Sequence, residues 1–364
     1  MSLTVAIAPD SFKGTLSARE VAEAIAEGWR SVRPEDELVL VPQADGGEGT
    51  LDAVEASEQG AVRRSAGEVT GPDGRPTPGE WLELPEGVAV VELAQASGLP
   101  LMHTLDVMGA TSRGTGEVIR RALDAGATTI VLGLGGSAST DGGAGALAAL
   151  GLELTDEQGD LVADGGGALR DIVGVGRAGL LEPPAGGVVL LTDVTAPLTG
   201  PSGAAAVFAP QKGATPAQVD ELDAALSHFA RLIGGDTDLP GSGAAGGTGY
   251  GFATVWGGRI ESGADYLAEL TGLTAVIGSA DLLVTGEGRF DSQSLGGKVV
   301  GQLLAVAERA GVRAGVVAGQ VTTETDVWTA SLTELAGSVE SAMGDTRRWL
   351  VTAGAQAARE LPGV

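Results

Sequence analysis

Five short apolar stretches in this 364-residue chain are each followed by a polar loop that combines Asp or Glu with Gly, Ser or Thr. Apolar stretches of about four to eight residues are typical of buried strands. In open α/β sheets, ligands bind outside the carboxyl ends of such strands. The pattern therefore predicts an α/β protein whose chemistry lies in strand-end loops, at residues 8–14, 45–50, 135–143, 192–194 and 285–294.

The order of strand and helix signals predicts two domains. Residues 1–60 open with two strand–loop–helix units, and residues 276–364 continue the same pattern. We expect these two tracts to form one doubly wound, flavodoxin- or Rossmann-like parallel sheet. Residues 61–275 would form a second α/β domain inserted between them, with the active-site cleft between the domains. Turn signals at 71–74 and 85–87 predict a more irregular structure for residues 61–100.

Charge and composition limit the classes of partner. The formal net charge of −26 argues against a nucleic acid or an anionic membrane, since both are bound by excess Lys and Arg. The chain has no cysteine, no typical signal peptide and no apolar run approaching about 18 residues. We expect a cytoplasmic monomer or homodimer that acts on a small molecule.

The lysines indicate where an anion could bind. Only three occur, Lys13, Lys212 and Lys298, and each lies in a polar segment that contains glycine. The sixty glycines also cluster between apolar runs, where the backbone turns sharply or approaches a ligand closely. These positions favour contact with an anionic ligand, although Lys212 could instead bind a loop carbonyl.

Strand-end carboxylates would repel a phosphate unless a divalent cation lay between them. Mg²⁺ takes one or two carboxylates together with phosphate oxygens and waters, which would resolve this conflict. Each carboxylate could instead cap a helix or interact with its dipole. Asp193 is the strongest candidate for a catalytic or binding role, because no obvious helix follows it that it could cap. The candidates are Asp45, Asp141, Asp193, Glu287 and Asp291.

Several segments, in order, resemble the signatures of the bacterial, ATP-dependent (type 1) glycerate kinase family. They cover nearly the whole chain and comprise 7–14, 44–50, 135–138 with 141–145, 203–213, 243–247, and 285–289 with Asp291. The resemblance implies Mg-ATP-dependent phosphorylation of D-glycerate to 2- or 3-phosphoglycerate and a two-domain α/β fold. Thr195 and Ala196 stand where the family usually has Asp-Asn, so we expect no catalytic role at position 195.

Direct in-line phosphoryl transfer requires positioning and charge neutralisation, which assigns hypothetical roles to the loop residues. We expect Asp193, Lys13 and Asp45 to be catalytic, with a carboxylate accepting the hydroxyl proton. The substrate would contact Ser11, Gly46, Gly47, Glu48, Arg289 and Asp291. ATP would contact Gly135, Gly136, Ser137, Gly297, Lys298 and Lys212. Mg²⁺ would bind Asp141 or Glu287.

Three other functions fit parts of the pattern. The chain could phosphorylate another small hydroxy acid, or sense a hydroxy acid without catalysis. A pyridine-nucleotide oxidoreductase is disfavoured, because Gly241–Gly246 matches the dinucleotide fingerprint but follows no strand.

Overall fold

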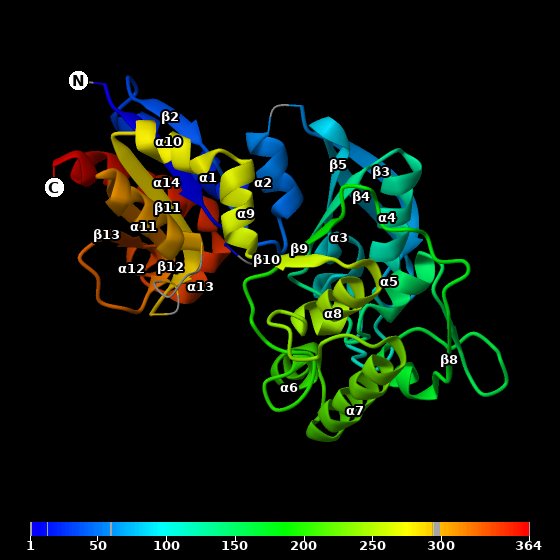
Figure 1. Ribbon diagram of the computed structural model, residues 1–364. Coiled ribbons are helices and arrows are strands. Elements are labelled where there is room, and N and C mark those ends of the chain that lie inside the picture. The colour runs from blue at the N-terminus through cyan, green and yellow to red at the C-terminus, as the bar shows by residue number, and fades with distance from the viewer. Residues whose placement is uncertain (1, 13, 59, 293, 295–298, 364) are drawn as a thin grey trace. The chain divides into compact units, whose positions relative to one another are not determined.

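The computed structural model describes residues 2–12, 14–58, 60–292, 294 and 299–363 (Figure 1). The chain separates into two compact units. Unit 1 comprises Met1–Asp45, Asp52–Gln59 and Ala264–Val364, and unit 2 comprises Gly46–Leu51 and Gly60–Gly263. The sequence predicted domain boundaries after residues 60 and 275. In the structure the chain returns to unit 1 at Ala264, twelve residues before the predicted position.

In the described part of unit 1, five strands form an all-parallel sheet. In spatial order they are β13 (Trp328–Ser331), β12 (Arg313–Val321), β11 (Leu282–Phe290), β1 (Thr4–Pro9) and β2 (Glu37–Leu40). The predicted α/β class with a parallel sheet is thus confirmed.

Helices cover both faces of the unit 1 sheet. Along β1, Val5 and Ile7 belong to one hydrophobic core, and Ala6 and Ala8 belong to another. This alternation follows from the twofold side-chain period of a strand. The helices of the unit are α1 (Ala18–Val32), α9 (Gly263–Leu270), α10 (Leu273–Ser279), α11 (Val299–Ala310), α12 (Leu332–Ala336), α13 (Val339–Gly344) and α14 (Thr346–Glu360). A sheet covered in this way is doubly wound, as predicted.

Helix α1 packs on α14 through two glycines. A Cβ on Gly28 would lie 2.0 Å from the carbonyl oxygen of Val351, and a Cβ on Gly354 would lie 2.2 Å from that of Ile25. A capping box formed by Ser17 and Glu20 begins α1. The sequence thus fixes where α1 starts, and the paired glycines allow the two helix backbones to touch.

Strand β11 is longer than the sequence indicated. The expected strand ended at Thr285, but the ladder continues to Phe290, with Glu287 paired to Ala318 of β12. Two glycines allow the backbones of β11 and β12 to lie close together. A Cβ on Gly286 would lie 2.1 Å from the carbonyl oxygen of Val317, and a Cβ on Gly319 would lie 2.4 Å from the carbonyl oxygen of Gly288. Glu287 and Arg289 therefore lie in a strand, and the predicted loop begins later.

Unit 2 contains a mixed sheet of six strands among the residues described. Strands β3 to β5 are antiparallel, whereas β5, β6, β9 and β10 are parallel neighbours. In spatial order they are β10 (Arg259–Glu261), β9 (Val188–Leu191), β6 (Thr129–Gly133), β5 (Val88–Glu92), β4 (Pro76–Leu84) and β3 (Val62–Thr70). Unit 2 also contains a two-stranded sheet formed by β7 (Glu153–Thr155) and β8 (Gly174–Gly176).

The prediction of irregular structure for residues 61–100 is wrong. This tract forms the three regular strands β3, β4 and β5. Polar side chains on β3 and β4 pair across the strands, as Arg64 does with Glu83 at 2.6 Å, and so conceal the apolar pattern. A β-bulge between Ser65 and Gly67 also interrupts, in β3, the alternation of apolar and polar residues that a strand with one solvated face would otherwise show.

One hydrophobic core joins the sheet of unit 2 to its helices. The helices are α3 (Leu93–Ser97), α4 (Arg113–Asp124), α5 (Ala144–Ala149), α6 (Ala204–Phe208), α7 (Pro216–Ile233) and α8 (Ala244–Trp256), and α2 (Thr50–Ser57) has residues in both units. Thr215 caps α7, with Pro216 at its first position. In the part of the chain that the structure describes, no helix is long and apolar enough to cross a lipid bilayer.

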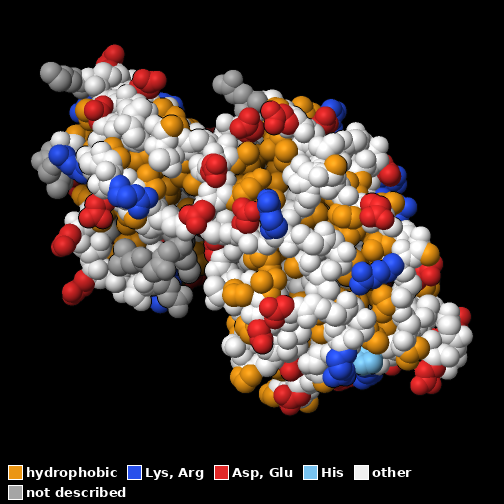
Figure 2. Space-filling view, in the orientation of Figure 1, with side chains coloured by type: hydrophobic (Ala, Val, Ile, Leu, Met, Phe, Trp, Pro, Cys, Tyr) orange, Lys and Arg blue, Asp and Glu red, His pale blue; other side chains and the backbone are white. Residues whose placement is uncertain are grey.

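Acidic side chains are spread over the surface rather than gathered in one patch on the face shown in Figure 2. Arg and Lys side chains are interspersed among them on this face. This face therefore carries no single acidic patch.

We predict that Gly28→Ala lowers the free energy of unfolding by about 1–3 kcal/mol or more, because the new methyl group overlaps the backbone of α14. Urea denaturation measures the change. The control is Gly278→Ala in α10, where the added Cβ meets nothing within 4 Å. That variant should be neutral or gain about 0.5–1 kcal/mol. Equal stability of Gly28→Ala and the wild type would contradict the packing described.

Candidate active site

The predicted site residues fall into two groups, one in each unit. Unit 1 carries Ser11, Asp45, Glu287, Arg289 and Asp291. Unit 2 carries Gly46, Gly47, Glu48, Gly135, Gly136, Ser137, Asp141, Asp193 and Lys212. Lys13, Gly297 and Lys298 lie outside the described residues.

In unit 1, the loop after β1 lies beside β11. The register pairs Pro9 with Gly286, and the Asp10 backbone N–H donates to the Gly286 carbonyl oxygen at 2.8 Å. The Asp10 carboxylate accepts a hydrogen bond from the Ser11 backbone N–H at 2.6 Å. Ser11 therefore follows a backbone that is anchored next to Glu287.

Arg289 and Asp291 form an ion pair with an N–O distance of 3.5 Å. The Arg289 side chain is 64% exposed and that of Asp291 is 26% exposed. Asp291 and Ser294 exchange hydrogen bonds of 3.1 and 3.3 Å, which close the turn after β11. Arg289 is thus an exposed cation whose ion pair with Asp291 is long, which suits a residue that binds an anion.

In unit 2, the 46–47 loop packs directly on the end of β6. The Gly135 N–H donates to the Gly46 carbonyl oxygen at 3.0 Å. A Cβ on Gly135 would lie 2.4 Å from the Gly47 Cα, and a Cβ on Gly133 would lie 2.5 Å from the Gly46 carbonyl oxygen. These glycines allow backbone to touch backbone, and the Gly135 N–H is already used within the protein.

Glu92 belongs to this edge of the sheet, although the sequence analysis missed it. It ends β5 and its side chain is buried, with 6% of the residue exposed. It accepts hydrogen bonds from the backbone N–H groups of Gly49 at 3.2 Å and Leu51 at 3.1 Å. The same signal, a carboxylate directly after an apolar stretch, could have identified it.

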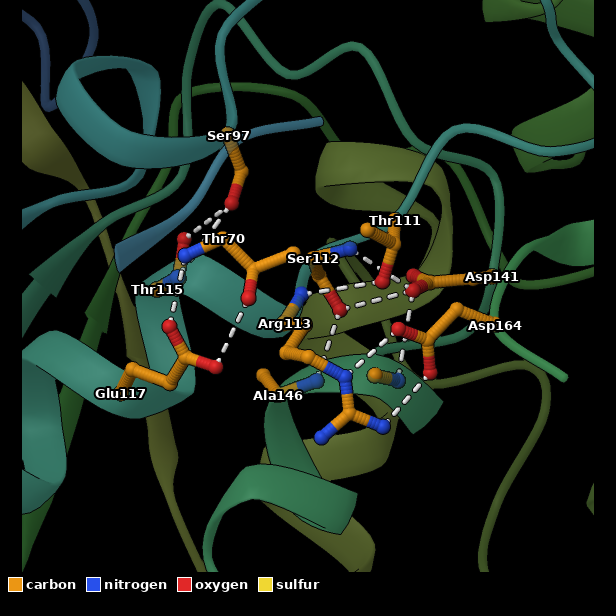
Figure 3. A network of polar contacts seen from close by, with 11 residues as sticks. Thr70, Ser97, Thr111, Ser112, Arg113, Thr115, Glu117, Asp141, Ala146 and Asp164 are labelled. Carbon is orange, nitrogen blue, oxygen red and sulfur yellow. Dashed lines mark hydrogen bonds and ion pairs between the residues drawn. The ribbon is translucent and has the colours of Figure 1, made fainter. Parts of the chain in front are cut away.

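Asp141 is enclosed by hydrogen-bond donors. Its carboxylate accepts from the Ser112 N–H at 2.9 Å and Oγ at 2.8 Å (Figure 3). It also accepts from the N–H groups of Gly143 at 3.1 Å and Gly145 at 3.3 Å. Burial raises the pKa of Asp141, and these hydrogen bonds oppose the rise. The carboxylate is 0% exposed and anchors the start of α5, which is a poor environment for the Mg²⁺ ligand expected from the sequence.

Lys212 and Ser137 are brought together as predicted for one site. Lys212, in the short helical turn Pro210–Lys212, donates from Nζ to Ser137 Oγ at 2.9 Å and to the Ser139 carbonyl oxygen at 2.5 Å. The second bond is the loop-carbonyl contact that the sequence left open. Burial lowers the pKa of Lys212 from 10.5 to about 8, and the charge of Asp141 opposes this decrease.

Asp193 is the second residue after β9 and is exposed. Its Oδ1 accepts a hydrogen bond from Ser262 Oγ at 2.9 Å, and Ser262 follows the neighbouring strand β10. This contact joins the ends of two parallel strands. Ser262 was not predicted, because nothing in its local sequence distinguishes it from any other surface serine.

Among the residues described, no group of three or more His, Asp or Glu side chains is arranged to hold a metal ion. A Mg²⁺ ion that accompanies a nucleotide needs only one or two carboxylates, since phosphate oxygens and waters supply the remaining ligands. Glu287, half-buried near the end of β11, has the required donor chemistry. Asp141 does not fit, because its oxygens already accept four hydrogen bonds.

Comparison with known proteins agrees with this arrangement of strand-end loops. The model of the glycerate kinase family matches residues 5–362. The chain belongs to the glycerate kinase family. The resemblance stated from the sequence is confirmed.

The curated relatives span most of the chain. The glycerate 2-kinase of Escherichia coli (strain K12) is 45% identical over 307 residues, which cover 82% of this chain and 80% of that protein. The glycerate kinase of Bacillus subtilis (strain 168) is 44% identical over 306 residues, or 81% and 79% of the two chains.

A solved structure of this family shares the fold. It is a crystal structure from Salmonella typhimurium LT2 of a protein assigned as glycerate kinase 2, and it is 39% identical to this chain. The similarity covers 100% of this chain and 99% of that one, with a TM-score of 0.81. The α/β fold described above is therefore the fold of a glycerate kinase family member.

The buried ammonium of Lys212 predicts a pH-dependent stability. Below about pH 8 the ammonium is charged in both the folded and unfolded chains, so burial costs its full penalty. As the pH rises from about 8 to 10.5, the folded chain loses the proton first and the wild type becomes more stable relative to Lys212→Met. The gain should be at most roughly 3 kcal/mol, because one pKa unit corresponds to about 1.4 kcal/mol.

Denaturant unfolding of the wild type and Lys212→Met at several pH values measures this difference. Each variant serves as the other's reference, so changes at other titrating groups cancel. Stability curves that run parallel from pH 7 to 10.5 would show that Lys212 keeps its ordinary pKa.

Proposed function

We propose that this protein is a Mg-ATP-dependent glycerate kinase that phosphorylates D-glycerate by direct in-line transfer. The family match over residues 5–362 carries the proposal, and the signature loops lie at the ends of strands in both units. A relative with 45% identity is named glycerate 2-kinase, which favours 2-phosphoglycerate as the product here.

On the acceptor side, we assign the hydroxyl of glycerate to Asp193. Its exposed carboxylate, oriented by Ser262, would accept the hydroxyl proton as the oxygen attacks the γ-phosphorus and the bond to the β-phosphate oxygen breaks. Asp45 is the second candidate for this role. Arg289 and Lys13 would bind the substrate carboxylate, since a guanidinium can hold both oxygens. The remaining acceptor contacts we propose are Ser11, Gly46, Gly47, Glu48 and Asp291.

On the donor side, we assign the ATP phosphates to the backbone N–H groups of Gly136 and Ser137, to Lys212, and to Gly297 and Lys298. Gly135 is left out of this set, because its N–H is bonded to Gly46. Mg²⁺ held by Glu287 would neutralise charge on the phosphates. In transfers of this kind the protein contributes mainly position and electrostatic stabilisation.

We predict that purified protein with ATP, Mg²⁺ and D-glycerate forms a phosphomonoester, observed by ³¹P NMR against a control without glycerate. The coupling pattern identifies the product, because the phosphorus couples to one proton in 2-phosphoglycerate and to two in 3-phosphoglycerate. A doublet is expected. A triplet would reverse the assigned position, and the absence of any new phosphomonoester would reject the glycerate kinase proposal.

We predict that Asp193→Asn lowers kcat by about 10²–10⁴, the usual contribution of a general base. The KM for ATP should change little, because Asp193 is assigned to the acceptor hydroxyl. Asp160→Asn makes the same chemical change at an exposed loop position with no proposed role and should retain full activity. Steady-state kinetics of the two variants decide the point: comparable kcat values would remove Asp193 from the mechanism.

A further inference from the structure

A buried acid and a buried base meet at one loop in unit 2. Asp141 is 0% exposed and Lys212 is 3% exposed. Asp141 ends the segment 137–141, Lys212 binds Ser137 and Ser139 within it, and Ser139 and Thr140 are also fully buried. The structure thus removes two opposite charges from water at the loop that follows β6.

The Asp141 side is fixed by the starts of two helices. Ser112, the residue before α4, donates to Asp141 through both its N–H and its Oγ. Ser112 Oγ in turn accepts a hydrogen bond from the Ala146 N–H at 3.0 Å, in the first turn of α5. Figure 3 shows these groups converging on the Asp141 oxygens. All four groups bonded to Asp141 are donors, which favours the ionised carboxylate.

The Lys212 side is fixed by the loop itself. Its ammonium has three N–H donors, and two of them bind Ser137 and Ser139, two and four residues before Asp141. Neither partner carries a charge. Among the described residues, Asp141 is the charged group whose field acts on Lys212. In the part of the chain that the structure describes, the Lys212 ammonium forms no direct hydrogen bond with the Asp141 carboxylate, and the two groups are linked through the loop that both hold.

We propose that Asp141 is a positioning residue for Lys212: together with Ser112 it fixes the 137–143 loop and supplies the negative charge that keeps the buried ammonium at that loop. This inference rests on the proposed function, in which Lys212 contacts the phosphates of ATP. Asp141 acts through Lys212 and the loop and touches neither substrate nor metal. This positioning role also explains why the acidic side chain of Asp141 occurs in a segment proposed to bind anions.

Because the chain has only three lysines, the proposal can be tested directly. Protein labelled with ¹³Cε-lysine is titrated by NMR, and the Lys212 signal is the one lost in Lys212→Arg. We expect its midpoint near pH 8 in the wild type. In Asp141→Asn the midpoint should fall by at least about half a pH unit, since an opposite charge that favoured the ammonium is removed.

Asp164→Asn is the matched control. Asp164 pairs with Arg113, beside Ser112 in the same network, at 2.6 and 2.7 Å. This variant loses a carboxylate close to the start of α4, but the Lys212 midpoint should stay within about 0.2 units of the wild-type value because its charge is not among those acting on Lys212. An unchanged or higher midpoint in Asp141→Asn, or an equal fall in Asp164→Asn, overturns the proposal.

Asp141→Asn could also prevent folding, since it leaves the ammonium buried without its countercharge. In that case the double variant Asp141→Asn/Lys212→Met should fold and show a cooperative thermal transition, because it no longer buries an uncompensated ammonium. A double variant that also fails to fold overturns the proposal.

In active enzyme, the alkaline loss of kcat should move to lower pH in Asp141→Asn, in step with the NMR midpoint. A loss of kcat at all pH values without this movement would indicate a structural role only. The NMR titration of Lys212 does not require catalysis. An inactive wild type would therefore reject the kinase proposal, and the positioning role of Asp141 could still be tested.

Discussion

A carboxylate without access to water imposes strict conditions on the chain around it. Burying a charge costs several kcal/mol unless hydrogen bonds and opposite charge compensate it. Asp141 meets these conditions through Ser112 before α4, through the N–H groups at the start of α5, and through the charge of Lys212. The positions of two helices and one loop in unit 2 therefore depend on a single side chain.

Close contact between backbones is the second constraint, and it explains much of the glycine content. At the end of β6 the 46–47 loop touches Gly133 and Gly135, and in unit 1 the strands β11 and β12 touch at Gly286 and Gly319. Any Cβ at these positions would overlap a neighbouring backbone atom. Glycine clusters at strand ends thus indicate contact within the protein as readily as contact with a ligand, and Gly135 illustrates the former.

The candidate site could be predicted only in part. The sequence analysis selected carboxylates that follow an apolar strand as candidate site residues. This criterion identified Asp193, and applied to every apolar stretch it would also have identified Glu92. It could not separate Asp193, which is exposed, from Asp141, which is buried, because both lie in loops that follow an apolar strand. The partner that distinguishes them, Ser112, lies 29 residues before Asp141. Lys212 shows the same limit, since its partner Ser137 lies 75 residues away.

The sequence by itself determined the α/β class, the positions of most strands and helices, the caps of α1 and α7, and membership of the glycerate kinase family. These features depend on local apolar periodicity, on contacts within about four residues, or on short motifs. The tertiary structure alone decided the length of β11, the regular strands of residues 61–100, and which charged groups are buried. Such features depend on packing between distant segments, where hydrogen-bond partners and loss of solvent are set by neighbours that no local pattern identifies.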